Sequence, residues 1–326
     1  MAFRESMEAM TPLSANARSE LASAFPPEGF KEFVSPRVDR LGFLAGRLEA
    51  AGVPHSVLEM AGSRNLILRF PTRAYSGKYR VKCLSAHYDR DPRSPGANDN
   101  SAACFQLLEF AVALHASKAV HDCMFVFTDN EEMAAAAGSR AQGSFAIAEG
   151  WRRLKLDPPW VFSFDCTGRG EVPVLSLSAY SAYSLPGRGG PRAPALERLD
   201  PLQAWTQAFL ERLLPGSWAL LPTPYSDNLG YLMGGLPAVA LTMLPREEAV
   251  SFGKALAENP ILEHILLKRE FRTVAGKRML DRALPGTWLR LHGKRDDVFS
   301  LEPRSFAVMR DLLGALAAVR IPLRGV

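Results

Sequence analysis

The spacing of apolar residues in the first part of the chain predicts a helix followed by two strands. In Arg37–Ala51 apolar side chains recur every three or four residues, which is typical of an amphipathic helix, and Gly52 ends the pattern. Two strand-like runs, Ser56–Met60 and Asn65–Phe70, follow on either side of Gly62. Together these two runs predict a β-hairpin.

After this hairpin, continuous apolar runs alternate with helical patterns. The predicted strands are Tyr79–Ala86, Cys123–Thr128, Trp160–Asp165, Val172–Leu177 and Ala238–Met243. The predicted helices are Ser101–Leu114, Ser139–Glu149, Leu202–Leu214, Asp227–Met233 and Leu301–Val319. Strands that are apolar on both faces and separated by helices indicate a buried, mostly parallel sheet. The predicted fold class is therefore α/β: a single domain with a mostly parallel, mixed β-sheet covered by helices on both faces.

The chain shows no linker that would divide it into independent domains. Residues 1–34 are rich in Ser, Ala, Pro and Glu and are expected to form a loosely attached arm, so the predicted domain spans residues 35–326. A Gly-, Pro- and Arg-rich loop at 179–198 and an insertion of helices and loop around 245–290 are also predicted. Both are expected to border a substrate site, since long loops in compact domains are often functional.

Composition and charge narrow the classes of function. The formal net charge of +5 is spread along the chain without a basic patch interleaved with aromatic residues, so no nucleic-acid partner is expected. There is no window of about 18 apolar residues, and the polar stretch Met1–Ser19 does not resemble a signal peptide. We therefore expect a cytoplasmic protein with no membrane partner. The four cysteines form no Cys-x-x-Cys pair and are expected to be reduced and buried. The oligomeric state stays open.

The ends of the predicted strands carry residues that could bind a metal. In sheets of this kind ligands bind outside the carboxyl ends of the strands, where several strands deliver side chains to one edge. The residues expected there are His87, Asp99, Glu131, Glu132 and Asp165, together with His292 near the end of the chain. Each alone has a plainer explanation; Asp99, for example, could cap the helix that follows it. Their predicted convergence is what favours a shared site.

Imidazole and carboxylate groups are natural ligands for zinc. Several carboxylates at one edge of a sheet would repel one another strongly unless cations neutralised them. The set of residues therefore predicts a metal site, and its number of carboxylates favours two divalent cations over none.

The order of these residues resembles that in the two-zinc aminopeptidases, a metallopeptidase family that also contains the glutaminyl cyclases. The similar motifs are His87-Tyr88-Asp89, Gly96-Ala97-Asn98-Asp99-Asn100, Glu131-Glu132 before Gly138-Ser139, Asp165, Ser226-Asp227 before Gly235-Leu236-Pro237, and His292 with Asp296. They run in the family's order from about residue 40 onward. The resemblance implies the family's zinc exopeptidase fold, which is phosphorylase/hydrolase-like.

The resemblance also implies two zinc ions and a place for each ligand. One zinc would be held by His87 and Asp165, the other by Glu132 and His292, and both would be bridged by Asp99. The family carries a cis peptide after its bridging aspartate, which here would join Asp99 to Asn100.

The resemblance also implies roles for site residues that would not hold a metal ion. Glu131 would be the general base and later the general acid. Asp89 would orient the imidazole of the first zinc site, and Asp296 would support that of the second. We expect Tyr225 and Asp227 to contact the substrate.

The leading prediction is a zinc-dependent exopeptidase. It would be an aminopeptidase that hydrolyses the N-terminal residue from a peptide or small aminoacyl substrate. The run Ser101-Ala102-Ala103-Cys104 is closer to the cyclases, whereas the four-residue step from His292 to Asp296 is closer to the aminopeptidases. A glutaminyl-cyclase-like aminoacyltransferase and a non-catalytic binding relative are therefore the alternatives.

Overall fold

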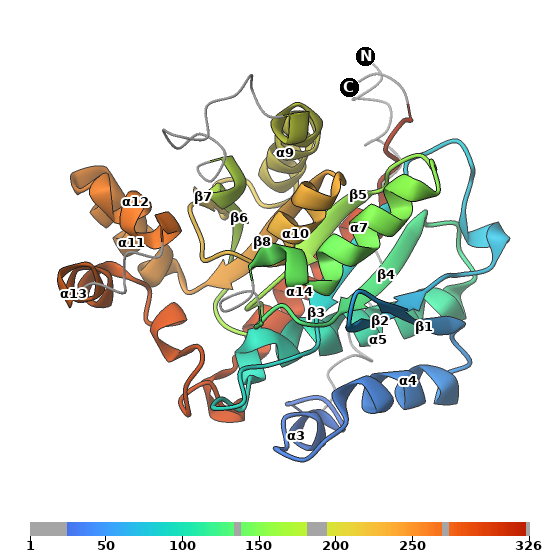
Figure 1. Ribbon diagram of the computed structural model, residues 1–326, viewed down its shortest axis with the longest axis horizontal. Helices are drawn as coiled ribbons and strands as arrows, with labels where there is room; N and C mark the ends of the chain where they lie inside the picture. Colours follow the sequence, from blue (N-terminus) through green and yellow to red (C-terminus); the bar gives the residue numbers. More distant parts are fainter. Residues whose placement is uncertain (1–24, 134–137, 181–193, 269–273, 324–326) are drawn as a thin grey trace.

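The centre of the protein is a mixed β-sheet (Figure 1). The computed structural model describes residues 25–133, 138–180, 194–268 and 274–323. Within these residues the sheet has eight strands in the order β1-β2-β4-β3-β5-β8-β6-β7. Their bounds are β1 (His55–Met60), β2 (Ser63–Leu68), β3 (Lys82–His87), β4 (Cys123–Thr128), β5 (Trp160–Phe164), β6 (Val172–Ser176), β7 (Ala219–Leu221) and β8 (Ala238–Leu244).

Four adjacent central strands, β4, β3, β5 and β8, run parallel to one another. Their register aligns His87 with Thr128, and Phe164 with Leu241, so the carboxyl ends of the four strands lie at one edge. The flanking strands are different, because β2 is antiparallel to β4 and β6 is antiparallel to β8. The antiparallel flanks extend the sheet, while the parallel centre delivers side chains to one edge.

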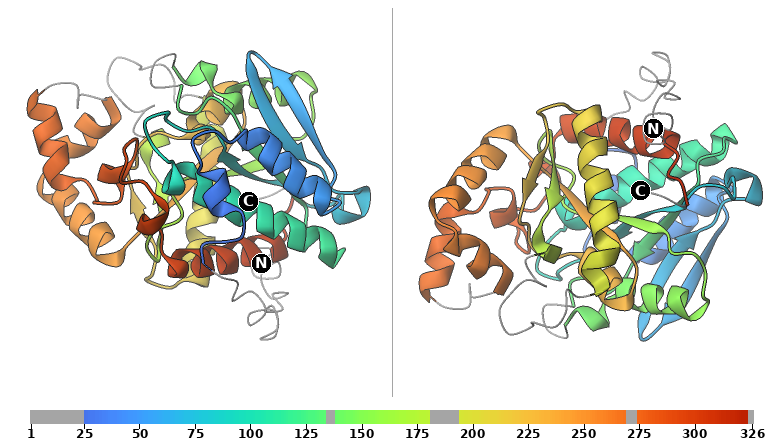
Figure 2. Two further views of the ribbon diagram at one scale, coloured as in Figure 1. Left: turned by 90° about the horizontal axis from the view of Figure 1, so that it is seen from below. Right: turned by 90° about the horizontal axis from the view of Figure 1, so that it is seen from above.

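Helices cover both faces of this parallel centre. Lys82 at the start of β3 donates through Nζ to the carbonyls of Ala317 and Val319, at 3.3 and 2.6 Å, at the end of α14 (Pro303–Ala318). On the opposite face of β3, Ser85 shares a 2.8 Å hydrogen bond with Tyr231 of α10 (Asp227–Gly234). Helix α5 (Ala102–Ser117) lies beside α14, and α7 (Gly143–Arg153) packs on α10 (Figure 2). The prediction of an α/β fold with both faces covered is confirmed.

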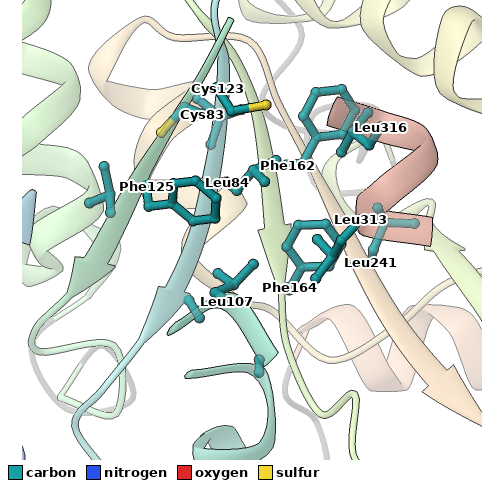
Figure 3. Close-up of a cluster of buried hydrophobic side chains, with 14 of the residues drawn as sticks. Cys83, Leu84, Leu107, Cys123, Phe125, Phe162, Phe164, Leu241, Leu313 and Leu316 are labelled. Atoms are coloured by element: carbon teal, nitrogen blue, oxygen red, sulfur yellow. The ribbon is translucent and has the colours of Figure 1, made fainter. Parts of the chain in front are cut away.

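The core between β5 and α14 is made of aromatic and leucine side chains. Phe162 and Phe164 of β5 lie near Leu313 and Leu316 of α14, and all four are essentially buried (Figure 3). Each such side chain stabilises the fold by about 1.5–3 kcal/mol relative to an exposed one. The four cysteines are free and buried, as the sequence predicted. This core holds the central strands, and with them the edge that carries the polar residues.

The predicted N-terminal arm is packed where the structure describes it. Residues 1–24 lie outside the described residues, but α3 (Phe30–Phe33) buries Phe30 and Phe33 fully against Phe105 of α5, with ring centroids 4.9 and 5.4 Å apart. Helix α4 (Arg40–Ala50) follows, and its N-cap Asp39 accepts a hydrogen bond from the Gly42 amide. The boundary at residue 34 stays a prediction.

The segment predicted as an insertion forms helices beside the β6–β7 edge (Figure 1). They are α11 (Arg246–Glu258), α12 (Ile261–Lys268) and α13 (Val274–Ala283). Together with β6 they enclose a second, smaller apolar cluster, in which Phe252 of α11 packs edge-on against Trp288, with ring centroids 5.2 Å apart. Most of the predicted loop at 179–198 lies outside the described residues.

Most predicted elements exist with shifted ends. The pattern at Ser139–Glu149 divides into a short 3-10 turn, Ser139–Ala141, and α7, while α9 (Pro194–Leu213) begins before its predicted start at Leu202. Strand β7 was not predicted, because three residues carry too little periodicity to detect. No helix among the described residues combines the length and apolar character needed to cross a membrane.

Candidate metal centre

The first group of polar residues is positioned by the ends of the parallel strands. His87 is the last residue of β3, and the following amide, that of Tyr88, continues the ladder by donating to Thr128 of β4 at 2.8 Å. Asp165 directly follows β5, and its amide donates to the carbonyl of Leu241 at 3.0 Å. Regular strand pairing therefore places the side chains of His87 and Asp165 at the same edge.

Asp99 reaches this edge on a turn that is tied to the sheet. The turn begins at Gly96, where φ is +65° and an added Cβ would lie 2.7 Å from the Asp99 carbonyl oxygen, so only glycine fits. The peptide Asp99–Asn100 is cis, as the family resemblance implied. The buried side-chain amide of Asn100 donates to the carbonyl of Phe164 at 2.9 Å, which joins the turn to the end of β5.

Asp296 holds the other side of the same turn. Its carboxylate accepts from the amides of Asn98 and Asp99 at 2.8 and 3.1 Å. Burial raises the pKa of Asp296 to about 7, and the charge of Asp99 acts in the same direction. The observed contacts of Asp296 are thus with the backbone of the turn that carries Asp99. Support of His292, which the resemblance implied, stays a prediction.

His87, Asp99 and Asp165 form what we call the first subsite. The Nε2 atom of His87 lies 3.3 Å from Asp99 Oδ1 and 3.6 Å from Asp165 Oδ1. Its Nδ1 atom faces Asp89, 3.2 Å from the backbone oxygen and 3.5 Å from Oδ1. Burial lowers the pKa of His87, but the carboxylates of Asp165, Asp89 and Asp99 outweigh this effect and hold it well above its ordinary value. The three carboxylates around His87 therefore favour the protonated form of its imidazole.

Glu132, His292 and the second oxygen of Asp99 form the second subsite. His292 Nε2 lies 3.3 Å from Asp99 Oδ2 and 3.2 Å from Glu132 Oε2. Hydrogen bonds that His292 donates to the carboxylates of Asp99 and Glu132 raise its pKa to about 11. Asp91 also offers a carboxylate oxygen here, and its ligand atom and those of Glu132 and His292 all lie within 4.8 Å of one another. Asp99 therefore faces both subsites, one oxygen to each.

The donor set fits two divalent cations. A zinc ion with bonds of about 2.1 Å separates its tetrahedral ligand atoms by about 3.4 Å, close to the spacings between imidazole and carboxylate atoms here. Two buried ligand atoms, His87 Nε2 and Glu132 Oε1, have no hydrogen-bond partner among the described residues. Since an unpartnered buried polar atom is costly, these two atoms are suited to binding a metal ion.

Glu131 lies beside both subsites on the loop that follows β4. The carboxylate of Asp89 accepts from the amides of Glu131 and Glu132 at 3.1 and 3.0 Å, so Asp89 positions this loop as well as facing His87. Gln142 donates through Nε2 to Glu131 Oε1 at 3.1 Å. Burial raises the pKa of Glu131 well above its ordinary value, although the nearby His87 opposes the shift. A carboxyl group with a raised pKa is suited to accept and return a proton.

A cavity of about 110 Å³ opens onto these residues. Its polar wall contains Asp99, Glu131, Glu132, Asp165 and His292. The rest of the lining includes Tyr225, Leu241, Trp288 and Leu291, and contact of Tyr225 with the substrate stays a prediction.

Asp227, the other predicted substrate contact, is placed differently. Ser226 lines the cavity, whereas Asp227 is fully buried and accepts a hydrogen bond from Thr128 at the end of β4. Burial raises the pKa of Asp227 to about 6. Its observed contact is thus with the end of β4 through Thr128, and contact of Asp227 with the substrate stays a prediction.

Two residues at the site were missed in the sequence. Asp91 stands only two positions after Asp89, so an acidic residue in the loop after β3 was a usable signal. Gln142 carried no signal, because nothing in the local pattern indicates that its amide reaches Glu131.

Comparison with known protein families supports the resemblance that the motifs predicted. The sequence profile of peptidase family M28 matches residues 65–216. Over these residues the predicted resemblance is confirmed. The M28 match contains His87, Asp99, Glu131, Glu132 and Asp165. It supports a hydrolase that acts on peptide bonds.

Solved structures show the same fold at low sequence identity. The LapA aminopeptidase of Legionella pneumophila superposes with a TM-score of 0.60 at 14% identity, covering 98% of this chain and 76% of LapA. A Zn-dependent exopeptidase from Parabacteroides distasonis gives 0.56 at 13%, with coverage of 88% and 95%. The glutaminyl cyclase of Porphyromonas gingivalis gives 0.54 at 15%, with coverage of 88% and 92%. At these identities the likeness establishes the fold. No curated protein sequence matched the chain.

Proposed function

We propose that this protein is a zinc-dependent exopeptidase that removes the N-terminal residue of a peptide or small aminoacyl substrate. The observation that carries the proposal is Asp99, whose two carboxylate oxygens face two separate imidazoles, His87 and His292. Such an arrangement is suited to a carboxylate that bridges two metal ions. The M28 peptidase match supports the choice of peptide-bond hydrolysis as the reaction.

The residues then divide into two ligand sets. His87 and Asp165 would hold one zinc ion, Glu132 and His292 would hold the other, and Asp99 would offer one carboxylate oxygen to each. Zinc bound there would polarise the scissile carbonyl and lower the pKa of a water molecule. Asp89 orients His87 and fixes the loop that carries the two glutamates.

Glu131 performs the proton transfers. Its carboxylate accepts a proton from the attacking water and returns it to the leaving amine. The Gln142 amide holds Oε1 of Glu131 and leaves Oε2 for the water. The surrounding burial favours the protonated form of Glu131, which helps it to deliver the proton in the second step.

The size of the cavity supports action at a chain end. A space of about 110 Å³ bounded by Tyr225, Trp288 and Leu291 suits one terminal side chain. The free amino group of the substrate would bind near one of the zinc ions, at the polar wall of the cavity.

Glutaminyl cyclisation is the second candidate. It is favoured by the run Ser101-Ala102-Ala103-Cys104, which is closer to the cyclases than to the aminopeptidases. A cyclase would close an N-terminal glutamine on itself and would need one zinc ion rather than two.

Metal content and activity of the purified, unchelated protein test both candidates. About two zinc ions per chain, with release of aniline from aminoacyl anilides, would support the aminopeptidase. About one zinc ion, with turnover of glutaminyl peptides alone, would support the cyclase. No zinc even after dialysis against it would contradict both and favour a binding role.

A further inference from the structure

The second subsite contains a carboxylate that the motif comparison did not include. We propose that Asp91 is an additional ligand of the cation held by Glu132, His292 and Asp99. The proposal rests on the proposed function, because it takes a cation at this subsite as given. Its basis is the convergence of one ligand atom each from Asp91, Glu132 and His292, all within 4.8 Å of one another.

Arg93 fixes the carboxylate of Asp91 in place. Oδ1 of Asp91 accepts from the backbone amide of Arg93 at 2.8 Å and from its Nε at 3.0 Å, while Oδ2 accepts from Nη2 at 2.6 Å. A carboxylate has about four lone-pair directions, so these three donors leave one on Oδ2. Asp91 itself is largely buried, whereas the Arg93 side chain is exposed. Arg93 thus orients the carboxylate and leaves one lone pair for a cation, as the hydrogen-bond partners of metal ligands usually do.

The loop that carries Asp91 is anchored to the loop of His292. Ser94 donates through its hydroxyl to the carbonyl of Gly293 at 3.1 Å, and its amide donates to the Asp91 carbonyl at 3.0 Å. The two loops therefore keep Asp91 and His292 together. This contact joins segments about 200 residues apart in the sequence.

Asp91 makes the two subsites chemically different. The first subsite has three protein groups, His87, Asp99 and Asp165, which leaves a tetrahedral zinc one open position. With Asp91 the second subsite has four groups, and three of them are carboxylates. Oxygen-rich sites favour harder ions such as Mn²⁺ more than imidazole-rich sites do. The second subsite is therefore the one that accepts Mn²⁺ more readily in place of zinc.

The competing explanation is that Asp91 only caps its own loop by accepting from the Arg93 amide. Asparagine keeps an oxygen for that amide but lacks the negative charge, so Asp91→Asn separates the two roles. Asp91→Glu restores the charge and is the rescue variant. Asp39→Asn is the matched control, since Asp39 also accepts from a backbone amide but lies at the start of α4.

The test is metal binding by the full-length, metal-stripped protein, measured by competition with a chromophoric chelator for Zn²⁺ and Mn²⁺. We expect two wild-type sites, and an affinity of the second subsite lowered about 10- to 100-fold in Asp91→Asn, with a larger loss for Mn²⁺ than for Zn²⁺. Asp91→Glu should recover part of the loss, and Asp39→Asn should bind as wild type. In a His292→Ala background, Asp91→Asn should have no further effect on the remaining site.

The visible absorption of the Co²⁺-loaded protein gives a second readout. A ligand change at Asp91 should alter the spectrum, whereas loss of a loop cap should leave it unchanged. Asp91→Asn with wild-type affinities and spectrum would overturn the assignment of Asp91 and leave the two-metal proposal standing. A wild type that binds no cation would overturn both, and that outcome is visible before any variant is made.

Discussion

The two subsites of the candidate metal centre are built in different ways. His87 ends a central strand and its side chain is only 1% exposed, whereas His292 lies on a loop with φ of +56° and its side chain is 51% exposed. The first imidazole is positioned by the parallel ladder between β3 and β4, which continues past it to the amide of Tyr88. The second is positioned by contacts between loops. Asp99, whose two carboxylate oxygens face the two imidazoles, thus connects a rigid half of the site to one that depends on loop packing.

The largest expected effect is on turnover, from a change at Glu131, which lies beside both subsites. Glu131→Gln should lower turnover by roughly 10²–10⁴, because the amide cannot accept the water's proton. Both zinc ions should stay bound, since Glu131 is not among the proposed ligands. Single-turnover kinetics together with metal content check this. Glu149→Gln on the exposed face of α7 is the matched control. Wild-type turnover in the zinc-loaded Glu131→Gln protein would remove Glu131 from the mechanism.

Replacing His87 or His292 by alanine tests directly whether the two subsites differ in rigidity. In the metal-free protein, His87→Ala leaves Asp99 and Asp165 without their buried cationic partner and should lower the free energy of unfolding by about 3 kcal/mol or more. His292→Ala acts at a half-exposed position and should cost about 1 kcal/mol or less. Urea unfolding at neutral pH measures both. Equal losses would show that the two halves do not differ in rigidity.

The pH dependence of the free energy of unfolding tests whether the buried region around the first subsite includes Asp227. Burial raises the pKa of Asp227 from 3.8 to about 6, so the folded protein binds this proton more tightly than the unfolded chain does. That contribution is complete below about pH 3.8 and is lost as the pH rises through 6. Asp227→Asn cannot ionise, so its stability relative to wild type should improve between pH 4 and 7 by up to about 3 kcal/mol. Urea unfolding of both metal-free proteins at several pH values measures this. A difference that is constant with pH would contradict the buried position of Asp227.

The smallest expected effect is on substrate preference, at the wall supplied by the inserted segment. Trp288 lines the cavity, packs on Phe252 of α11, and follows Thr287, whose amide donates to Glu248 at 2.8 Å. Trp288→Leu enlarges the cavity and should shift kcat/KM toward larger N-terminal residues by about tenfold. Phe252 lies behind this wall, so Phe252→Leu should produce a smaller shift in the same direction. A panel of aminoacyl anilides measures both. An unchanged preference in Trp288→Leu would mean that this wall does not contact the terminal side chain.

The same contrast explains which parts of the site could be predicted. His87, Glu132 and Asp165 follow strands whose apolar runs are continuous, and parallel pairing brings the ends of such strands together. The motif at Asp227 was less informative, because a motif match does not say whether the side chain faces the cavity or Thr128. Sequence position was informative where the backbone is regular and much less so where loops decide the direction of a side chain.

The sequence by itself determined the α/β class, the parallel centre and the set of residues that end its strands, because hydrophobic periodicity and short motifs are local properties. Only the tertiary structure decided that Asp91 lies beside Glu132, that Gln142 reaches Glu131, and that Trp288 lines the cavity. These contacts involve residues in irregular segments. Their geometry depends on how loops pack on the sheet, and no local pattern of apolar and polar residues records that packing.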